Sequence, residues 1–335
     1  MAPETDIDKG TRIMWIKRRP GWALSESQVT DEAVYLRRRE ILKTLGLGGA
    51  LAVAGRNALA AGPALPPGVS TALNLRYPPG RALTDEKAAT TYNNYYEIAT
   101  IKDVWRGAQA IPQRPWSIAV GGLCGKPKTW TIEDVLKQFP VEERIYRHRC
   151  VEAWAMTVPW SGFPLAKLID LAEPGPDAAY VRFTTLANPK VMPGLSDPTF
   201  PWPYVEGLTL AEARHDLAFV ATGMYGKPMP PQDGGPIRLV LPWKYGFKSA
   251  KAIVKIEFVK QRPMNFWQAI NPDEYGFWAN VNPAVPHPRW SQARERLIGT
   301  NEMVPTQIYN GYGEFVAPLY AGMIKQGVKP TVLFR

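Results

Sequence analysis

The residue best suited to chemistry in this chain is Cys150, which lies in the segment RHRCVEAW over residues 147–154. The flanking arginines, and a protonated His148, would stabilise a thiolate, the form of cysteine that binds metals and attacks electrophiles. Two other interpretations stay open: a buried, unreactive thiol, and a disulfide with Cys124 in an oxidising compartment. The local sequence marks Cys150 as a candidate ligand or nucleophile without deciding among the three.

Several common catalytic motifs are absent. The chain has no Gly-x-Gly-x-x-Gly after a predicted strand, no Gly-Lys-Ser/Thr, no His-Glu-x-x-His and no Gly-x-Ser-x-Gly, so nicotinamide, nucleotide and hydrolase functions lose their usual support. Its 3 His and 2 Cys are too few for a histidine-built metal centre or a four-cysteine cluster. Any metal must therefore be held largely by something other than the protein.

A second segment with binding chemistry is 243–251, which contains three Lys residues and follows a Gly/Pro-rich turn over 230–238. Its backbone N–H groups and lysines suit a phosphate, although a solvated basic turn is equally compatible with the spacing. The net charge of +10 comes from scattered residues with no basic run interleaved with aromatics, so we expect no nucleic-acid binding. Binding of an anionic cofactor or of a membrane surface explains the excess of positive charge equally well.

The N-terminal residues 1–60 are expected to be an export signal. Basic residues that include Arg38-Arg39 precede a Gly/Ala/Leu stretch and the small-residue sequence Ala58-Leu59-Ala60, as in a signal peptide. Because the apolar stretch has only about 11 residues, it is too short to span a bilayer. Arg38-Arg39 followed by Ile-Leu-Lys resembles the twin-arginine motif, which implies export of a folded protein to the periplasm. A basic amphipathic helix is the alternative.

The rest of the chain is expected to be an α+β fold in which a mixed β-sheet sandwich carries short helices. A Pro-rich extended lead-in over 61–90 precedes a single domain over 91–335, whose segment 261–335 wraps around it. A capping box at Thr131 opens a helix that ends near residue 139, and a second helix is predicted over 162–171. Strands are predicted over 116–120, 144–151, 180–185, 236–241 and 252–259.

Five segments are together long enough to indicate a family. They are YNNYYE (92–97), RCVEAW (149–154), VPWSGFPL (158–165), PWKYGFK (242–248) and HPRWSQ (287–292). With these segments the chain resembles the molybdopterin-containing catalytic subunits of periplasmic protein-methionine-sulfoxide reductases, within the sulfite oxidase fold family. The resemblance runs from the signal peptide to about residue 300, and it implies a sulfite-oxidase-type molybdopterin-binding domain.

The resemblance also implies roles for single residues. Cys150 would be the one protein ligand of a molybdenum whose other sulfurs come from the dithiolene of one molybdopterin; this excludes the disulfide and suits a soft thiolate. Glu152, in phase with Cys150 on a strand, is a candidate for proton delivery or for a structural hydrogen bond, and His148 ranks below it. The residues implied in cofactor binding are Asn93, Tyr96, Glu97, Thr185, Asp233, Arg238, Ser249, Ala250 and Lys251. Position 233 is usually Asn in the family, so Asp lacks an amide donor there.

The activity that the resemblance implies is molybdenum-dependent reduction of methionine sulfoxide in periplasmic proteins, which repairs oxidised methionine. Electrons would come from quinol through a membrane haem b partner, and the twin-arginine translocase would export the folded protein. Sulfite oxidation on the same fold is the first alternative, but the acidic and apolar VEA that follows Cys150 suits a neutral sulfoxide better than a dianion. A metal-free periplasmic binding or scaffold protein is the second. We expect a monomer.

Overall fold

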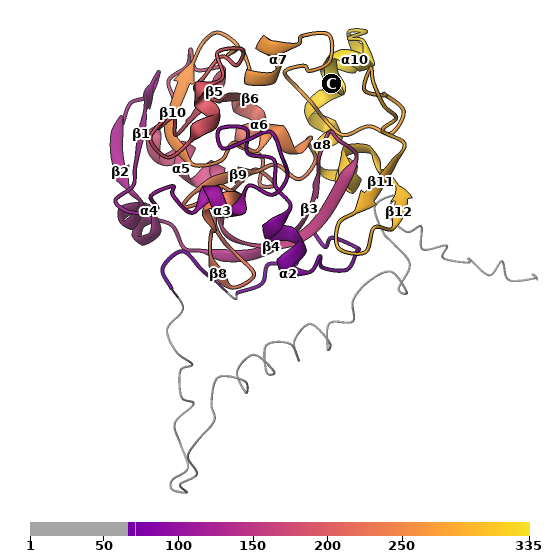
Figure 1. The fold of residues 1–335 in the computed structure, drawn as a ribbon. Helices are drawn as coiled ribbons and strands as arrows, with labels where there is room; N and C mark the ends of the chain where they lie inside the picture. The colour runs from indigo at the N-terminus through magenta and orange to yellow at the C-terminus, as the bar shows by residue number, and fades with distance from the viewer. Residues whose placement is uncertain (1–65, 71) are drawn as a thin grey trace, which may run out of the picture.

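The computed structural model describes residues 66–70 and 72–335 (Figure 1). The predicted signal peptide over 1–60, and residues 61–65 of the predicted lead-in, lie outside this range. The described part of the lead-in is irregular up to the helix α2 (Glu86–Thr91), apart from an isolated bridge between Leu73 and Glu143. Asp85 caps this helix by accepting a hydrogen bond from the backbone N–H of Ala88.

Two mixed β-sheets form the body of the fold. The first has the order β2-β1-β10-β5-β6, with bounds Lys128–Thr131, Ser117–Gly122, Ile253–Val259, Tyr180–Thr185 and Val205–Thr209. The second has the order β12-β11-β4-β7-β8, with bounds Met303–Pro305, Arg294–Leu297, Trp154–Pro164, Phe219–Met224 and Lys227–Pro228. To it belong also β3 (Glu142–Arg149), which pairs with β4, and β9 (Arg238–Val240), which pairs with β7.

Short helices lie between and around these sheets. They are α3 (Trp105–Ala108), α4 (Ile132–Gln138), α5 (Leu165–Ala172), α6 (Leu210–Ala213), α7 (Phe266–Ile270), α8 (Gly313–Val316), α9 (Ala321–Lys325) and α10 (Pro330–Leu333). The pairs β1–β10 and β11–β4 are parallel, and the other named pairs are antiparallel. This combination of mixed sheets and short helices confirms the predicted α+β class. In the described part of the chain, no helix has the length and apolar character needed to cross a membrane.

The local signals in the sequence located five of the strands and two of the helices. Each of the five predicted strands overlaps an observed one, and β5 has the predicted bounds. The capping box was also correct in its main contact, because the Thr131 hydroxyl accepts a hydrogen bond of 3.1 Å from the N–H of Asp134 at the start of α4.

The predicted helix over 162–171 was wrong at its start. The backbone stays extended as far as Pro164, because residues 162–164 pair with β7, and only then does α5 begin. A bulge separates Ser161 from Gly162, and a Cβ atom at Gly162 would lie 1.9 Å from the carbonyl oxygen of Val220. Glycine is therefore required where β4 and β7 approach each other.

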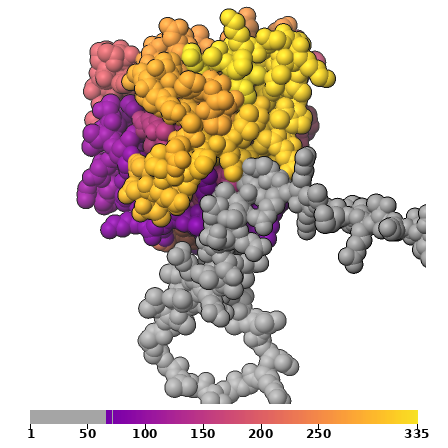
Figure 2. All heavy atoms as spheres, turned by 90° about the vertical axis from the view of Figure 1, so that its right-hand side faces the viewer, coloured from indigo at the N-terminus to yellow at the C-terminus, as the bar shows by residue number. Residues whose placement is uncertain are grey.

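The last part of the chain lies against the sheets rather than apart from them. Figure 2 shows the orange and yellow residues of the C-terminal segment covering much of one face. Its strands β11 and β12 extend the second sheet, where β11 pairs with β4. Trp243 and Tyr320 meet in the core, with a hydrogen bond of 2.8 Å from the indole N–H to the hydroxyl oxygen. The predicted wrap-around segment thus contributes β11, which pairs with the start of β4 close to Cys150.

Candidate active site

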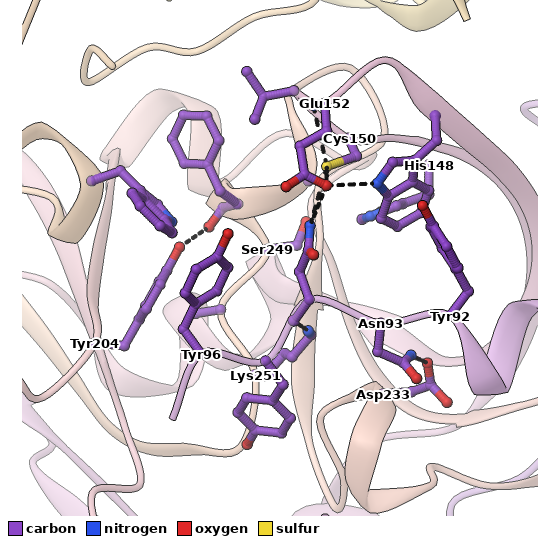
Figure 3. A pocket seen from close by; sticks show the side chains of 18 of the residues that line it. Tyr92, Asn93, Tyr96, His148, Cys150, Glu152, Tyr204, Asp233, Ser249 and Lys251 are labelled. Carbon is purple, nitrogen blue, oxygen red and sulfur yellow. Dashed lines mark hydrogen bonds between the residues drawn. The ribbon is translucent and has the colours of Figure 1, made fainter. Parts of the chain in front are cut away.

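A cavity of about 440 Å³ gathers residues from many parts of the chain (Figure 3). Of the residues implied by the resemblance, those that line it are Asn93, Tyr96, Glu97, Cys150, Glu152, Asp233, Arg238, Ser249, Ala250 and Lys251. Thr185 does not line the cavity; its hydroxyl donates to Glu97 at 3.5 Å from behind. The structure therefore brings together segments that lie up to 158 residues apart.

Cys150 occupies a tight turn between the antiparallel strands β3 and β4. The N–H of Cys150 donates to the carbonyl of Trp154 at 2.9 Å, and the N–H of Ala153 donates back to the carbonyl of Cys150 at 3.1 Å. Ala153 has a positive φ of 62°, which closes the turn. The expectation that Cys150 and Glu152 share one side of a strand was wrong, because β3 ends at Arg149; the turn brings them together instead.

The Cys150 sulfur is buried, with 5% of the residue exposed, and it is a free thiol, as is that of Cys124. The disulfide that the local sequence left open is therefore not formed. Burial and the neighbouring Glu152 raise the pKa of the Cys150 thiol to about 12, and they outweigh Lys102 and Arg149, which act in the other direction. The charge of Arg149 thus favours the thiolate, as expected, but burial and Glu152 outweigh it; a metal ion would provide the further positive charge that the thiolate needs.

Polar groups from three segments surround the sulfur. The side-chain N–H of Asn94 lies 3.5 Å from Sγ and the backbone N–H of Glu152 lies 3.4 Å from it. Oε2 of Glu152 is 3.8 Å from Sγ and accepts hydrogen bonds from Asn94 and from the indole of Trp154, each 3.0 Å long, and from the ammonium of Lys102. Burial raises the pKa of Glu152, but these donors outweigh it and lower the pKa overall.

Deeper in the cavity, two acids and two cations lie close together. Burial raises the pKa of Glu97 and that of Asp233 to about 7, against the pull of Lys251 on both and of Arg238 on Asp233. Burial lowers the pKa of Arg238 to about 10, and burial with the nearby Arg238 lowers that of Lys251 to about 8. Such a cluster of perturbed groups in a cavity is typical of a binding or catalytic site.

Within the described residues, two buried acceptors at this end have no hydrogen-bond partner. Asn93 donates to Oδ1 of Asp233 at 2.7 Å, which leaves Oδ1 of Asn93 and Oδ2 of Asp233 without a donor. A pterin ring carries amino and N–H donors that match such acceptors, and its phosphate would suit Arg238 and Lys251. The donors, acceptors and charges therefore fit a molybdopterin whose sulfurs face Cys150.

His148 also lines the cavity, and it packs closely against the backbone of segment 243–251. A Cβ atom at Gly246 would lie 2.5 Å from its Nε2, so glycine is required there. Burial, together with Arg238 and Lys251, lowers the pKa of His148 to about 3. The expectation that a protonated His148 stabilises the thiolate was wrong, since the imidazole is neutral at physiological pH.

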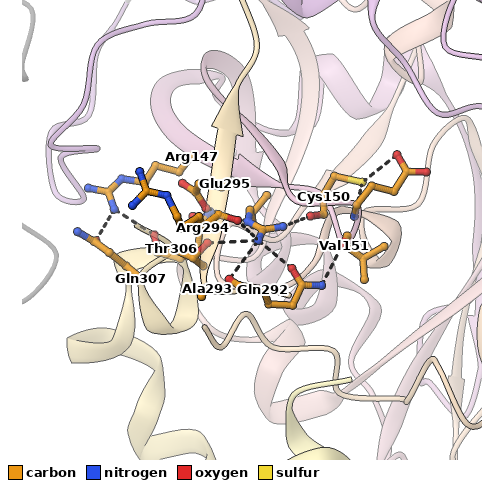
Figure 4. Close-up of polar contacts among 12 residues, drawn as sticks. Arg147, Cys150, Val151, Gln292, Ala293, Arg294, Glu295, Thr306 and Gln307 are labelled. Carbon is orange, nitrogen blue, oxygen red and sulfur yellow. Dashed lines mark hydrogen bonds and ion pairs between the residues drawn. The ribbon is translucent and has the colours of Figure 1, made fainter. Parts of the chain in front are cut away.

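A buried network supports the turn from the side away from the cavity (Figure 4). Arg149 is fully buried, donates to Glu295 at 2.8 Å and to Gln292 at 2.8 Å, and holds the carbonyl of Cys150. Gln292 in turn donates to the carbonyl of Val151 at 2.8 Å. The arginine beside the ligand thus holds its backbone rather than its sulfur.

One wall of the cavity is aromatic. Tyr96 packs edge-to-face on Trp267 with ring centroids 4.9 Å apart, and Trp267 contacts Tyr275 at 5.3 Å. Phe200 lies 6.0 Å from Tyr96 on the same wall. An apolar wall with polar groups at one end is the usual composition of a site for a partly apolar ligand.

The sequence analysis missed Asn94, Lys102 and Trp154 as parts of the site, and of the aromatic wall it named Tyr96 alone. Asn94 and Trp154 lie inside two of the segments that carry the resemblance, so these segments could have indicated both residues as parts of the site. Lys102 follows in an irregular segment with no motif around it. Only the fold places it beside Glu152.

Comparison with known proteins gives two kinds of match. The family model of the oxidoreductase molybdopterin binding domain matches residues 107–267. The protein-methionine-sulfoxide reductase catalytic subunit MsrP of Xanthomonas axonopodis pv. citri is 48% identical over 309 residues, which are 90% of this chain and 96% of that protein. MsrP of Burkholderia mallei is 46% identical over 310 residues, 90% of this chain and 94% of that protein. The sulfane dehydrogenase SoxCD from Paracoccus pantotrophus matches at 16% identity with a TM-score of 0.41, over 54% of this chain and 46% of that chain, too distant to carry an argument.

Proposed function

The chain belongs to the family of protein-methionine-sulfoxide reductase catalytic subunits, and on that premise we propose that it reduces methionine sulfoxide in proteins to methionine at a molybdenum bound by Cys150. The observation that carries the proposal is a free cysteine that faces a cavity whose far end combines two cations with two unpartnered acceptors. Methionine sulfoxide, two electrons and two protons give methionine and water, so the site must bind a sulfoxide and handle protons.

The cofactor is molybdopterin with one molybdenum, and the residues that would hold it divide into two groups. Cys150 would bind the metal through its sulfur. Asn93, Asp233, Arg238 and Lys251 would hold the pterin and its phosphate through the acceptors and charges described above. When bound, this cofactor supplies the two-electron oxygen-atom transfer chemistry.

The residues around the sulfur would bind and orient the substrate oxygen and the proton that it takes up. The carboxylate of Glu152, with Oε2 3.8 Å from Sγ, can orient a water molecule next to the reacting centre. The aromatic wall, with Trp267 opposite the polar groups, would hold the apolar part of an oxidised methionine by contacts between sulfur or methyl groups and rings.

A carboxylate in this position is unfavourable for sulfite. A dianion at the metal would approach Oε2 of Glu152, whose ionised form is favoured by Lys102, Asn94 and Trp154. A sulfoxide is neutral and meets no such repulsion. The sulfite alternative is therefore not favoured by the charges of this site.

The place of the reaction and its electron donor are part of the proposal. The basic residues before residue 60, which include Arg38-Arg39, support twin-arginine export of the folded protein to the periplasm. As the family resemblance implies, its electrons would come from a membrane haem b partner that oxidises quinol. Oxidised periplasmic proteins would be its substrates.

The test is to compare wild type, Cys150→Ser and the matched control Cys124→Ser, each exported through the twin-arginine route. Wild type and Cys124→Ser should hold about one molybdenum per chain and reduce methionine sulfoxide with a dye as electron donor. Cys150→Ser should do neither. Metal-free wild type, made with ample cofactor supply, would instead indicate a scaffold protein, and turnover of sulfite alone would indicate the sulfite alternative.

A further inference from the structure

Lys102 reaches the site from an irregular segment between α2 and α3. Its ammonium donates to Oε2 of Glu152 and to Oδ1 of Asn94, and its side chain is 30% exposed. Its backbone carbonyl accepts a hydrogen bond of 3.1 Å from the N–H of Asn93, which holds the two segments side by side. Lys102 therefore contacts both of the side chains that flank the Cys150 sulfur without touching the sulfur itself.

This contact determines which end of the Asn94 amide faces the sulfur. An ammonium can only donate, so the amide oxygen of Asn94 must point to Lys102. The amide nitrogen must then point the other way, where it lies 3.5 Å from Sγ of Cys150 and 3.0 Å from Oε2 of Glu152. Both of these atoms are acceptors when the sulfur is a thiolate.

The backbone of Asn94 is held as well. Its carbonyl accepts a hydrogen bond from the ammonium of Lys251, which lies on the opposite side of the residue. With its main chain held by Lys251 and its amide oxygen held by Lys102, the side chain of Asn94 has one favourable orientation. That orientation directs an N–H group at the metal ligand.

We propose that Lys102 is a positioning residue, which orients Asn94 as a hydrogen-bond donor to the Cys150 sulfur and so raises the reduction potential of the molybdenum. The inference rests on the proposed function, since it takes Cys150 as the metal ligand. A hydrogen bond to a thiolate and a nearby positive charge both draw electron density from the sulfur, and this favours the reduced metal. Without Lys102 both effects weaken in the same direction.

The first experiment measures the midpoint potential of the molybdenum in purified holoenzyme by redox titration followed by electron paramagnetic resonance. Lys102→Met should hold as much molybdenum as wild type and titrate at a lower potential. We expect a change of at least tenfold in the equilibrium between oxidation states, about 59 mV for a one-electron step. Lys102→Arg, which keeps the charge and the donors, should restore most of the wild-type value. An unchanged potential in metal-loaded Lys102→Met would overturn the inference.

The control removes a similar ion pair elsewhere. Lys227 pairs with Glu86 at 2.6 Å on the surface, and neither residue lines the cavity. Lys227→Met should therefore leave the potential at the wild-type value. A shift as large as that of Lys102→Met would show that the potential responds to charge anywhere on the chain, and would overturn the positioning role.

The second experiment asks whether Lys102 acts through Asn94. Asn94→Ala alone should lower the potential, and adding Lys102→Met to it should cause less than half the shift seen in wild type. Equal shifts in both backgrounds would overturn the role in orienting the amide. If Lys102→Met does not bind molybdenum, the inference is tested by Asn94→Ala alone. An unchanged molybdenum potential in Asn94→Ala would contradict the inference. The proposed function fails separately, if wild type itself holds no molybdenum or leaves sulfoxide unreduced.

Discussion

Replacing Glu295 by Gln should destabilise the protein strongly, although the two side chains have nearly the same shape. Glu295 is fully buried, and its two carboxylate oxygens accept hydrogen bonds from two different arginines. Oε1 accepts from Arg81 at 2.5 Å, and Oε2 accepts from Arg149 at 2.8 Å. In Glu295→Gln one oxygen becomes an NH₂ group, which would face a guanidinium as a second donor.

The expected loss follows from the burial of both partners. Arg81 is 6% exposed and Arg149 is 0% exposed, so neither can exchange the lost acceptor for water without rearrangement. Breaking a buried ion pair by removing one partner typically costs about 3–5 kcal/mol. At about 2–4 °C per kcal/mol for a large domain, the melting temperature should fall by roughly 6–20 °C.

Urea unfolding of wild type and Glu295→Gln, with the same slope against denaturant, measures the loss directly. The matched control is Glu86→Gln, which breaks the exposed pair with Lys227 and should cost about 0–1 kcal/mol. The reasoning is refuted if Glu295→Gln lies within about 1 kcal/mol of wild type, because the two arginines would then be compensated by something other than this carboxylate.

Two further variants test other parts of the molecule. Trp267→Ala should raise KM for an oxidised protein about tenfold and change KM for free methionine sulfoxide less, because the aromatic wall would also contact residues that flank the oxidised methionine; equal changes in the two KM values would contradict this. His215 accepts from the N–H of Leu217 and contacts the carbonyl of Phe315, and burial lowers its pKa. As the pH falls below about 6.5, His215 therefore takes up a proton in the unfolded chain before it does so in the folded protein. The free energy of unfolding that is present above that pH is then progressively lost. His215→Gln should flatten the dependence of urea stability on pH between 7 and 5, by less than about 1.4 kcal/mol per pH unit because the ring is partly exposed; parallel curves would contradict the assignment.

Local signals in the sequence determined a large part of the fold. The capping residue Thr131 marked the start of α4 because a cap contact involves residues only three apart. Strands with alternating burial, such as β5 with its pattern of half-buried and buried residues, were located because alternation appears in the sequence itself. Cys150, Asn93, Tyr96, Glu97 and Glu152 were named from segments long enough to be specific, and the resemblance that these segments carry implied the other six residues.

The strand β4 shows where such signals end. All eleven of its residues are buried, since it lies between β3 and β7 and is covered on both faces, so no alternation of polar and apolar residues marks it. Its last three residues were therefore assigned to a helix. Only pairing with β7 decides that the chain stays extended to Pro164.

The sequence by itself determined that Cys150 is the candidate metal ligand and which segments accompany it, since those properties belong to runs of neighbouring residues. Only the tertiary structure decided the charges and contacts around the sulfur. Lys102 meets Glu152 across 50 residues, and Arg149 meets Glu295 across 146 residues, so neither contact leaves a periodic pattern. Protonation also depends on burial by distant segments, which is why burial lowers the pKa of His148 and raises that of the Cys150 thiol.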